Sequence, residues 1–380
     1  MGQPLALRHV QKQYGAVWAV KDTSLDVRPG EFVSIVGPSG SGKTSLLTMI
    51  AGFEAPTAGA ILVGDQDVTA LAPNHRNIGM VFQKYALFPH MTVRQNIAFP
   101  LKMRRLAKGK AADSRVDAML DLVQLDALEH RYPHELSGGQ QQRVAVARAL
   151  VFDPPVILMD EPLGALDKKL RESMQVEIKQ IQERIGATVI YVTHDQEEAL
   201  TMSDRVAVMH GGQLEQIGTP VELYARPKTA FIADFVGSIN FIPGIICQSA
   251  GSSVTIRCGT ALLETSPSNL QDGAPPDIGE RVRIGVRPEH LEIDTLPQDG
   301  ALSTARGGSR SVSNPGAGLT GTVETIIFAG ASRLALIRLH DAPGIVLKAS
   351  LPAQLGALPE RGAKVALRIA PSAALIFDAG

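Results

Sequence analysis

The sequence predicts an α/β domain with a largely parallel sheet, followed by a smaller all-β barrel domain. A chain of 380 residues exceeds what one ordinary hydrophobic core usually serves, so two domains are expected. Up to residue 236, strand-like and helical segments alternate, which is typical of a parallel sheet covered by helices on both faces. From residue 237 to 380, short alternating segments separated by Gly, Pro and Asp are typical of a small barrel.

The strands and helices of the domain at 1–236 follow in order along the chain. Residues 32–36 are apolar apart from Ser34 and lie between Pro29-Gly30 and Gly37-Pro38, which suits a strand buried on both faces. Further strand-like segments lie at 5–7, 24–27, 78–82, 156–160, 188–192 and 205–209. Helical segments lie at 43–51, 138–150 and 168–185.

A helical subdomain, at about 84–155, is predicted as an insertion into the sheet domain. Within it, Val116, Leu120 and Val123 recur at helical spacing. A basic segment precedes them and comprises Lys102, Arg104, Arg105, Lys108 and Lys110. Two interpretations of this segment stay open: a solvated helix face, or a surface near anionic headgroups or a membrane partner.

The domain at 237–380 is predicted from six short segments that alternate apolar and polar residues. They lie at 253–257, 281–286, 320–327, 333–339, 344–349 and 364–369. Between them, residues 296–318 are rich in Gly, Ser, Ala and Pro, with almost no bulky apolar side chain. Such a stretch buries too little surface to offset its ordering entropy, so we predict a mobile loop.

The bulk composition narrows the function. The formal net charge is -1, which gives no electrostatic case for binding nucleic acid. Two cysteines, Cys247 and Cys258, cannot form a disulfide framework and suit a cytosolic compartment. The N-terminus has no signal-peptide pattern, and no window approaches the roughly 20 apolar residues of a spanning helix. If the protein works on a membrane, another chain is expected to form the pore.

A phosphate-binding loop is predicted at residues 37–44, whose sequence Gly-Pro-Ser-Gly-Ser-Gly-Lys-Thr matches G-x-x-x-x-G-K-[ST] in full. It lies between a predicted buried strand and a helix, whereas a chance glycine-rich turn needs neither. Its backbone N–H groups and the positive helix end favour phosphate. Lys43 suits the β- and γ-phosphates, and the Thr44 hydroxyl suits Mg²⁺, so ATP and Mg²⁺ are the predicted cofactors. The expected nucleotide-binding residues are Gly37, Pro38, Ser39, Gly40, Ser41, Gly42, Lys43, Thr44 and Ser45.

Two carboxylates end the apolar strand at 156–160. Neighbouring residues on a strand point to opposite sides, so Asp160 and Glu161 are expected to do different work. Asp160 suits the carboxylate that holds hydrated Mg²⁺. Glu161 suits the base that orients or deprotonates an attacking water, because open α/β sheets bind their ligands at these strand ends.

A second phosphate cradle is suggested by Leu-Ser-Gly-Gly-Gln at 136–140. Ser137 and Gln140 fit a capping box for the helix at 138–150. That explains neither Gly138 nor Gly139, which would allow close backbone approach to an anion. The segment resembles the signature motif of ABC-transporter ATPases. The resemblance implies a head-to-tail dimer, in which Ser137, Gly138, Gly139 and Gln140 of one subunit close over ATP held by the other.

Other motifs of that family occur in family order, and the resemblance covers residues 5–236. Tyr14 matches the aromatic residue that stacks on adenine, although packing would also explain it. Gln83 matches the glutamine that senses Mg²⁺ and the attacking water. His194 matches the histidine that contacts the γ-phosphate, although a lone histidine at a strand end is usually not catalytic. Residues 164–167 are similar to the dimer-contact loop, in which the family more often has Ser in place of Gly164.

The second domain also resembles a family domain. Residues 285–290, Gly-Val-Arg-Pro-Glu-His, look like the strand and turn in the OB-like β-barrel of importers for polyamines, sugars, iron and oxyanions. In those families the barrels of two subunits pack together, and some bind a regulator. The loop at 296–318 departs from that compact pattern and puts in doubt any regulatory site beside it. The resemblance thus implies a P-loop NTPase domain with an inserted helical subdomain, followed by an all-β OB-like barrel.

The cargo is indicated only indirectly. Residues 47–53, 78–90 and 237–241 look most like the spermidine/putrescine importer group, but iron and sugar importers share them. The resemblance implies permease subunits as partners, a solute-binding protein outside the cytoplasm as an indirect one, and a place on the cytoplasmic face of the inner (plasma) membrane.

Two alternatives stay open. The first is an ABC ATPase without a membrane partner that acts in translation or DNA repair. Those that act on ribosomes usually carry two cassettes in one chain, whereas this chain has one phosphate loop and one signature, and its balanced charge argues against RNA or DNA. A small-molecule P-loop kinase leaves the signature, His194 and the barrel without a role.

Overall fold

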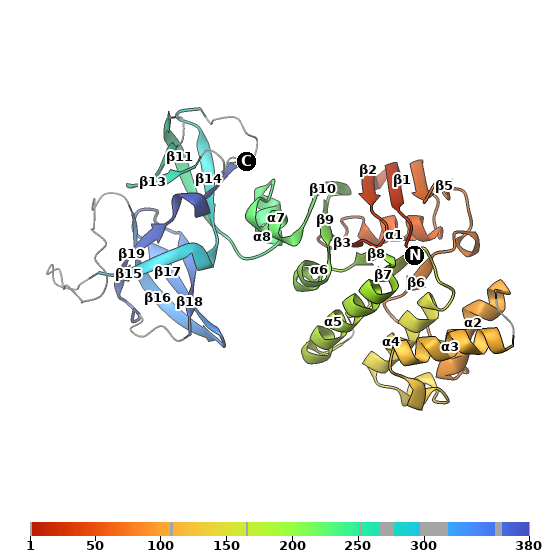
Figure 1. Cartoon of the computed structure of the whole chain (residues 1–380). Coiled ribbons are helices and arrows are strands. Elements are labelled where there is room, and N and C mark those ends of the chain that lie inside the picture. The colour runs from red at the N-terminus through yellow and green to blue at the C-terminus, as the bar shows by residue number, and fades with distance from the viewer. Residues whose placement is uncertain are drawn as a thin grey trace. The chain divides into compact units, whose positions relative to one another are not determined.

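The computed structural model describes residues 2–106, 109–164, 166–250, 253–266, 277–296, 318–353 and 359–379. The chain forms two compact units, Met1–Leu223 and Tyr224–Gly380, and Figure 1 labels most of their elements. The mobile loop predicted at 296–318 lies, apart from its two end residues, outside the described residues. Lys108 of the basic segment lies outside them too.

The first unit contains a six-stranded sheet in the order β10-β9-β3-β8-β7-β6. Its strands are β3 (Phe32–Val36), β6 (Gly79–Val81), β7 (Val156–Asp160), β8 (Thr188–Val192), β9 (Arg205–His210) and β10 (Gln213–Gly218). All pairings are parallel except that of β9 with β10. The predicted α/β fold with a largely parallel sheet is confirmed, and β3 and β8 are buried along their whole length.

Helices pack on both faces of this sheet because successive strand residues point to opposite sides. On one face, Phe32 and Tyr191 share a hydrophobic core with residues of α4 and α5. On the other face, Val33 and Ile190 share a second core with α1. The helices are α1 (Lys43–Ala51), α4 (Gly138–Leu150), α5 (Lys168–Ile185) and α6 (Gln196–Met202). The bounds predicted for α1, α4 and α5 are confirmed.

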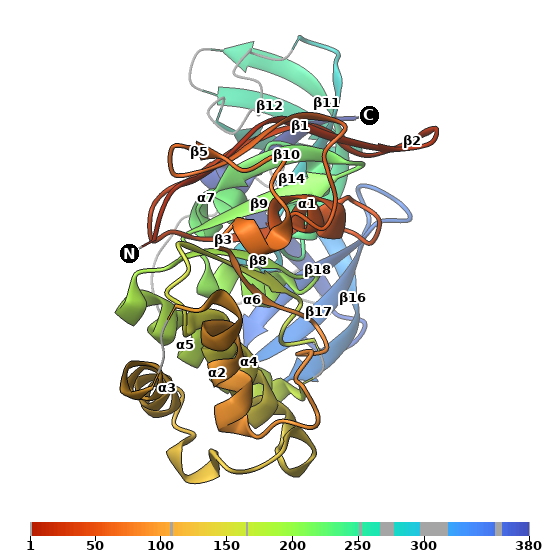
Figure 2. The ribbon, with the colours of Figure 1, turned by 90° about the vertical axis from the view of Figure 1, so that its right-hand side faces the viewer.

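The strand segments at 5–7 and 24–27 belong to a separate antiparallel sheet, which was not predicted from the sequence. The sheet has the order β2-β1-β4-β5. Its strands are β1 (Leu5–Tyr14), β2 (Val17–Val27), β4 (Ala58–Val63) and β5 (Gln66–Asp67). Alternating hydrophobicity indicates a strand but not the strand with which it pairs, so a second sheet could not be predicted from the sequence. Figure 2 shows the β1–β2 hairpin extending to a tip, and Tyr14 lies at the end of β1.

The helical subdomain contains α2 (Val93–Arg104), α3 (Lys110–Leu122) and α4 (Figure 2). Short 3₁₀ turns lie between α3 and α4 at Asp126–Leu128 and Pro133–Glu135, and another at Pro73–His75 precedes the subdomain. Val116, Leu120 and Val123 are buried in the core that α4 shares, as their helical spacing predicted. Of the basic segment, Arg104 donates to Asn77 and lies 4.0 Å from the Phe152 ring centroid. This part of the segment is therefore used within the chain.

From Asn240 onward the second unit is built of strands, as predicted for the barrel, in two five-stranded sheets with the orders β13-β12-β11-β14-β20 and β15-β19-β16-β17-β18. One hydrophobic core contains residues of both sheets, among them Ile242, Ile284, Val323 and Leu367. The strands of the first sheet are β11 (Asn240–Ala250), β12 (Ser253–Cys258), β13 (Ala261–Thr265), β14 (Arg281–Val286) and β20 (Leu375–Asp378). Those of the second are β15 (Leu291–Thr295), β16 (Leu319–Ala329), β17 (Ser332–Leu339), β18 (Val346–Pro352) and β19 (Lys364–Ile369).

Four of these strands, β11, β13, β15 and β20, were not predicted from the sequence. Pro243 and Gly244 interrupt the alternating pattern of β11, and neither is typical of a strand interior. The strand β20 has four residues, which is too short for a periodic pattern to stand out. Pairing with β14 holds both strands in place.

Arg287, from the segment at 285–290, is a buried anchor inside the second unit. Two helices precede the barrel strands, α7 (Pro220–Ala225) and α8 (Ala230–Phe235). Arg287 is 2% exposed, and its guanidinium donates to the carbonyl oxygens of Ala233 at 2.8 Å, Gly237 at 2.7 Å and Tyr224 at 3.1 Å. The last carbonyls of a helix have no partners within the helix. Arg287 therefore fastens the end of α8 to the start of the barrel.

Asp341 ties the two barrel sheets together. Its Oδ1 accepts from the Thr260 hydroxyl at 2.6 Å, next to β12. Its Oδ2 accepts from the Thr320 backbone N–H at 2.6 Å and from the Thr320 hydroxyl at 2.9 Å, in β16. Burial raises the pKa of the Asp341 carboxyl, but these hydrogen bonds outweigh burial and hold the pKa below its ordinary value. The tie is therefore strongest when Asp341 is ionised.

Replacing Asp341 by Asn should destabilise the barrel by about 1–3 kcal/mol at pH 7, because the amide cannot accept all three hydrogen bonds. A carboxyl whose pKa is lowered by folding stabilises the fold above its unfolded-state pKa of about 3.9, and this stabilisation is lost as the pH falls through the folded-state pKa. The difference between wild type and variant should therefore shrink below about pH 4. Hydrogen exchange of the β16 and β17 amides measures it.

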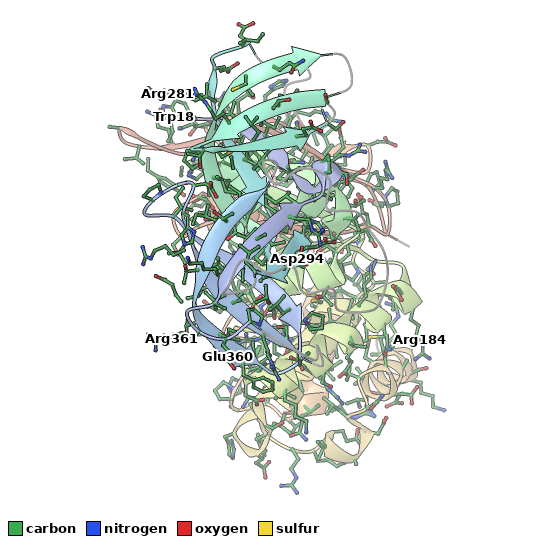
Figure 3. All side chains as sticks on the ribbon, turned by 90° about the vertical axis from the view of Figure 1, so that its left-hand side faces the viewer. Trp18, Arg184, Arg281, Asp294, Glu360 and Arg361 are labelled. Carbon is green, nitrogen blue, oxygen red and sulfur yellow. The ribbon has the colours of Figure 1, made fainter. Side chains whose placement is uncertain are left out.

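The matched control for this prediction is Asp294→Asn. Asp294 pairs with Arg368 at 2.5 Å, but both side chains are about half exposed, and Figure 3 labels Asp294. An exposed pair contributes about 0–1 kcal/mol. Equal protection losses in the two variants at pH 7 would show that Asp341 is an ordinary surface carboxylate.

Candidate active site

The predicted phosphate loop lies between β3 and α1, and its glycines are required by geometry. Gly42 has φ 98° and precedes α1, and no side chain caps this helix start. A Cβ on Gly42 would lie 2.3 Å from the Ala19 carbonyl oxygen in β2. Both this close contact and the positive φ therefore require glycine at position 42. Gly37 packs as closely, since its Cβ would lie 2.1 Å from the Met209 carbonyl oxygen. The loop is thus held between β2 and β9 with its outer residues, Pro38, Ser39, Gly40 and Thr44, exposed.

Lys43 places a positive charge inside this loop. The residue is 7% exposed, and Nζ donates to the carbonyl oxygens of Gly37 at 2.8 Å and Pro38 at 3.0 Å. Burial lowers the pKa of Lys43, and the charges of Glu161 and Asp160 oppose that shift. Beside it, the Ser41 hydroxyl is buried and has no hydrogen-bond partner among the described residues. A buried donor without a partner suits an anionic ligand oxygen.

Asp160 and Glu161 lie at the carboxyl end of β7, and only Asp160 belongs to the strand. Asp160 ends the strand, whereas Glu161 has φ 42°, in the left-handed region. The prediction that strand alternation separates the two carboxylates was wrong in its reason, because Glu161 has already left the strand. Burial raises the pKa of Asp160, the Glu161 charge raises it further, and Lys43 lowers it. A cation bound here would relieve the repulsion between the two carboxylates.

The three residues predicted as catalytic come together from loops that follow three neighbouring strands. Gln83 Nε2, after β6, donates to Glu161 Oε2 at 3.0 Å. His194 Nδ1, after β8, lies 3.1 Å from Glu161 Oε1. Each oxygen of the Glu161 carboxylate therefore has its own partner, and the carboxylate is held in one orientation.

Tyr14 lies apart from these residues, at the end of β1, and is 45% exposed. Its hydroxyl donates to Glu54, and Lys12 Nζ lies 4.9 Å from its ring centroid. The hydrogen bond with Glu54 is the main reason that its pKa is raised, and the Ser45 hydroxyl acts in the opposite direction. Tyr14 therefore lies near the first turn of α1 with an exposed ring.

The signature residues form the capping box that their spacing predicts. The Ser137 backbone N–H donates to Gln140 Oε1 at 2.9 Å, and the Gln140 N–H donates to Ser137 Oγ at 3.3 Å. The structure also gives the two glycines a packing reason. A Cβ would lie 3.2 Å from Leu166 at Gly138 and 3.1 Å from Leu170 at Gly139. Within one chain, then, capping and packing account for this segment, and its exposed start at Ser137 and Gly138 is open to a partner.

A buried network of polar and charged side chains around Glu198, four residues after His194, was not predicted from the sequence. Glu198 is 2% exposed, and its Oε2 accepts from the hydroxyls of Tyr191 at 2.7 Å and Thr193 at 2.8 Å. Arg171 of α5 lies 3.7 Å from Glu198 Oε1 and donates to the Leu166 carbonyl at 3.0 Å. The network thus connects the loop after β8 with the loop after β7. Charged residues in amphipathic helices usually face water, so their sequence gave no signal.

Neither a self-contained metal site nor a membrane-spanning helix is present in the part of the chain that the structure describes. No group of three or more His, Cys, Asp or Glu side chains there gathers to hold a metal by itself. No helix there is both long enough and apolar enough to cross a membrane.

Comparisons with known proteins agree with this geometry. The ABC transporter family model matches residues 20–164, and the TOBE domain model matches residues 284–377. The spermidine/putrescine import ATP-binding protein PotA of Frankia alni is 44% identical over 98% of this chain and 79% of its own. PotA of Chromobacterium violaceum is 49% identical over 77% and 80%, respectively.

Solved structures of ABC cassettes are similar to part of this chain. A dimeric structure of the bacterial ABC transporter cassette MJ0796 is 36% identical, with a TM-score of 0.51, over 57% of this chain and 98% of that one. A structure of the same cassette in a post-hydrolysis state, bound to ADP and Pi, is 35% identical with the same TM-score and the same coverage.

Proposed function

Since the chain belongs to the ABC transporter family, as an ATP-binding subunit of the importer type with a C-terminal β-barrel domain, we propose that it drives uptake of a polyamine such as spermidine or putrescine. It is an ATPase coupled to transmembrane transport. The observation that carries the catalytic part of the proposal is the Glu161 carboxylate, held between Gln83 and His194.

The phosphate groups of ATP are assigned to the loop at 37–44 and the first turn of α1. The backbone N–H groups and the buried Ser41 hydroxyl would bind the phosphate oxygens, and Lys43 would move from the loop carbonyls to the β- and γ-phosphates. Ser45 would extend this cradle into the helix, and Tyr14 would stack on adenine. The exposed ring of Tyr14 near α1 supports its role.

Mg²⁺ is assigned to Thr44, Asp160 and Gln83, together with the phosphates. The raised pKa of Asp160 beside Glu161 supports a cation at this point, and two or three protein ligands suit an ion that also binds phosphate and water. When bound, Mg²⁺ would neutralise charge that develops on the phosphates.

Glu161 is assigned as the general base that takes a proton from the attacking water. Gln83 would fix one carboxylate oxygen and His194 the other, so that Glu161 keeps one orientation while the proton moves. His194, which is 62% exposed at its side chain, would also contact the γ-phosphate.

The complete site is proposed to need a second copy of the chain in a head-to-tail dimer. Ser137, Gly138, Gly139 and Gln140 of the partner would close over the nucleotide. The dimeric state of the similar cassette structures supports this arrangement. Permease subunits, with a solute-binding protein acting through them, complete the proposed importer, and this chain would lie on the cytoplasmic face of the inner membrane.

Uptake in cells tests the proposed cargo. Cells lacking this chain should lose accumulation of labelled spermidine and putrescine, and the wild-type chain should restore it. Lys43→Ala should not, because losing a charged hydrogen bond of about 1.5–3 kcal/mol weakens ATP binding roughly 10- to 100-fold. Calorimetric titration of the purified variant with ATP measures that loss directly.

The control for this experiment is Lys21→Ala, which removes an exposed lysine of β2 and should support uptake normally. If polyamine uptake survives while iron, sugar or oxyanion uptake is lost, the motor role stands and the cargo is wrong. If Lys43→Ala binds ATP as tightly as wild type, the assignment of the phosphate loop fails.

A further inference from the structure

The loop that carries Gln83 contains two strained residues. Tyr85 has φ 58° and Ala86 has φ 47°, so two consecutive residues with side chains adopt the left-handed conformation. Each costs about 1–3 kcal/mol and persists only where its surroundings fix it. The Tyr85 N–H donates to the Phe82 carbonyl at 2.9 Å, which closes the turn on which Gln83 stands. The strain therefore lies directly beside the residue that binds Glu161.

Arg148 of α4 fixes this strained backbone. Its Nη2 donates to the Tyr85 carbonyl at 2.7 Å, and its Nη1 donates to the Ala86 carbonyl at 2.7 Å. The planar guanidinium thus holds both carbonyls at once, with two short hydrogen bonds in a fork. Its face lies 5.7 Å from the Phe88 ring centroid, two residues further along the same loop.

Packing alone does not explain a buried arginine at position 148, because a cation loses hydration free energy when it is buried. Arg148 is 9% exposed, and no ion pair with a carboxylate is found for it within the described ranges. Burying a cation without a counter-ion is costly, and the hydrogen bonds of Arg148 to the carbonyls of Tyr85 and Ala86 must offset that cost. By contrast, Arg143 on the same helix is partly exposed and pairs with Glu177 at 2.8 Å. The burial of Arg148 without a counter-ion therefore suggests that its hydrogen bonds to Tyr85 and Ala86 have a functional role.

We propose that Arg148 is a positioning residue for ATP hydrolysis, which fixes the backbone turn that presents Gln83 to Glu161. The path runs from Arg148 through the carbonyls of Tyr85 and Ala86 to the turn at 82–85, and from Gln83 Nε2 to Glu161 Oε2. The inference rests on the proposed function, since it requires Gln83 and Glu161 to act in hydrolysis. Lys43 and its loop lie outside this path.

Arg148→Lys tests the inference, because lysine keeps the charge but has no planar fork to hold two carbonyls. The kcat for ATP should fall about tenfold, while KM for ATP stays within about twofold, since Lys43 is untouched. In a Gln83→Ala background, Arg148→Lys should reduce kcat no further, because coupled residues are non-additive. Arg143→Lys should leave kcat unchanged. Rates are taken per folded protein, counted by ATP binding.

A rescue separates positioning from a structural role. Ala86→Gly relieves the left-handed strain, since glycine adopts this conformation without cost. Added to Arg148→Lys, it should return kcat to within about twofold of wild type. No rescue, or an equal loss in the Gln83→Ala background, overturns the inference. A defect in Gln83→Ala with an unchanged Arg148→Lys variant overturns the inference alone. An unchanged Gln83→Ala variant overturns the proposed role of Gln83, and the inference with it.

Discussion

Glu161→Gln should slow ATP hydrolysis at least about a hundredfold while ATP binding stays near normal, because general-base assistance is typically worth about 10²–10⁴ in rate. The amide oxygen of the variant can still accept the hydrogen bond from Gln83, which now joins it to Glu161 at 3.0 Å. The amide cannot take up a proton from water. Binding and turnover should therefore separate.

Two measurements check this result. ATP affinity and kcat are measured on the same purified variant, and its size is measured by gel filtration with Mg·ATP. Unhydrolysed nucleotide should trap a dimer. Glu197→Gln is the matched control, since Glu197 is exposed and lies three residues after His194. This variant should hydrolyse ATP at the wild-type rate. Wild-type turnover by Glu161→Gln would place the base elsewhere.

Ser137→Arg should bind ATP and fail to hydrolyse it, if Ser137 contacts the nucleotide of the opposite subunit. Its capping role predicts something smaller: losing the bond to the Gln140 N–H costs about 1 kcal/mol of stability. The α2 helix offers a matched control, because Thr92 and Gln95 form the same capping box. Thr92→Arg should lose similar stability and retain ATP hydrolysis per folded protein.

Mixing subunits makes this test decisive. A dimer of one Ser137→Arg chain and one Lys43→Ala chain has one composite site with both lesions and one with neither. Some activity should therefore return when the two inactive variants are mixed. No recovery, despite demonstrated subunit exchange, would contradict independent sites shared between chains.

The sequence predicted those parts of the fold that local chemistry decides. The helix at 43–51 is bounded by Gly42 and Gly52, both left-handed, and α5 runs from the cap at Asp167 to Gly186. Such end signals lie within a few residues of the helix they bound. The strands that pair in a sheet can lie far apart in the sequence, as β1 and β4 do. The four-stranded sheet with β1 and β2 could therefore not be predicted.

Of the candidate site, the sequence predicted residue types and order but not conformations. The structure brings Gln83, Glu161 and His194 together as their places after neighbouring parallel strands imply. The left-handed turn at Glu161 depends on contacts such as its N–H bond to the Val192 carbonyl at 2.9 Å, which a local pattern does not reveal. The buried roles of Arg148 and Glu198 were missed for the same reason, since a charged residue in a helix usually faces solvent.

The Arg287 anchor bears on how such barrels are inherited. Arg287 bonds to the main-chain carbonyls of Tyr224, Ala233 and Gly237, and every amino acid supplies a carbonyl. Substitutions between 224 and 237 therefore leave these hydrogen bonds intact where the backbone keeps its course, but Gly237 is constrained, because a Cβ there would lie 2.8 Å from the Tyr224 ring and 3.4 Å from the Arg287 guanidinium. A genetic crossover that joins a foreign barrel upstream of Tyr224 carries cation and carbonyls together. A crossover between 238 and 286 takes Arg287 and these carbonyls from different parent chains. The hydrogen bonds to Arg287 still form if the backbone of the other parent follows the same path at these positions.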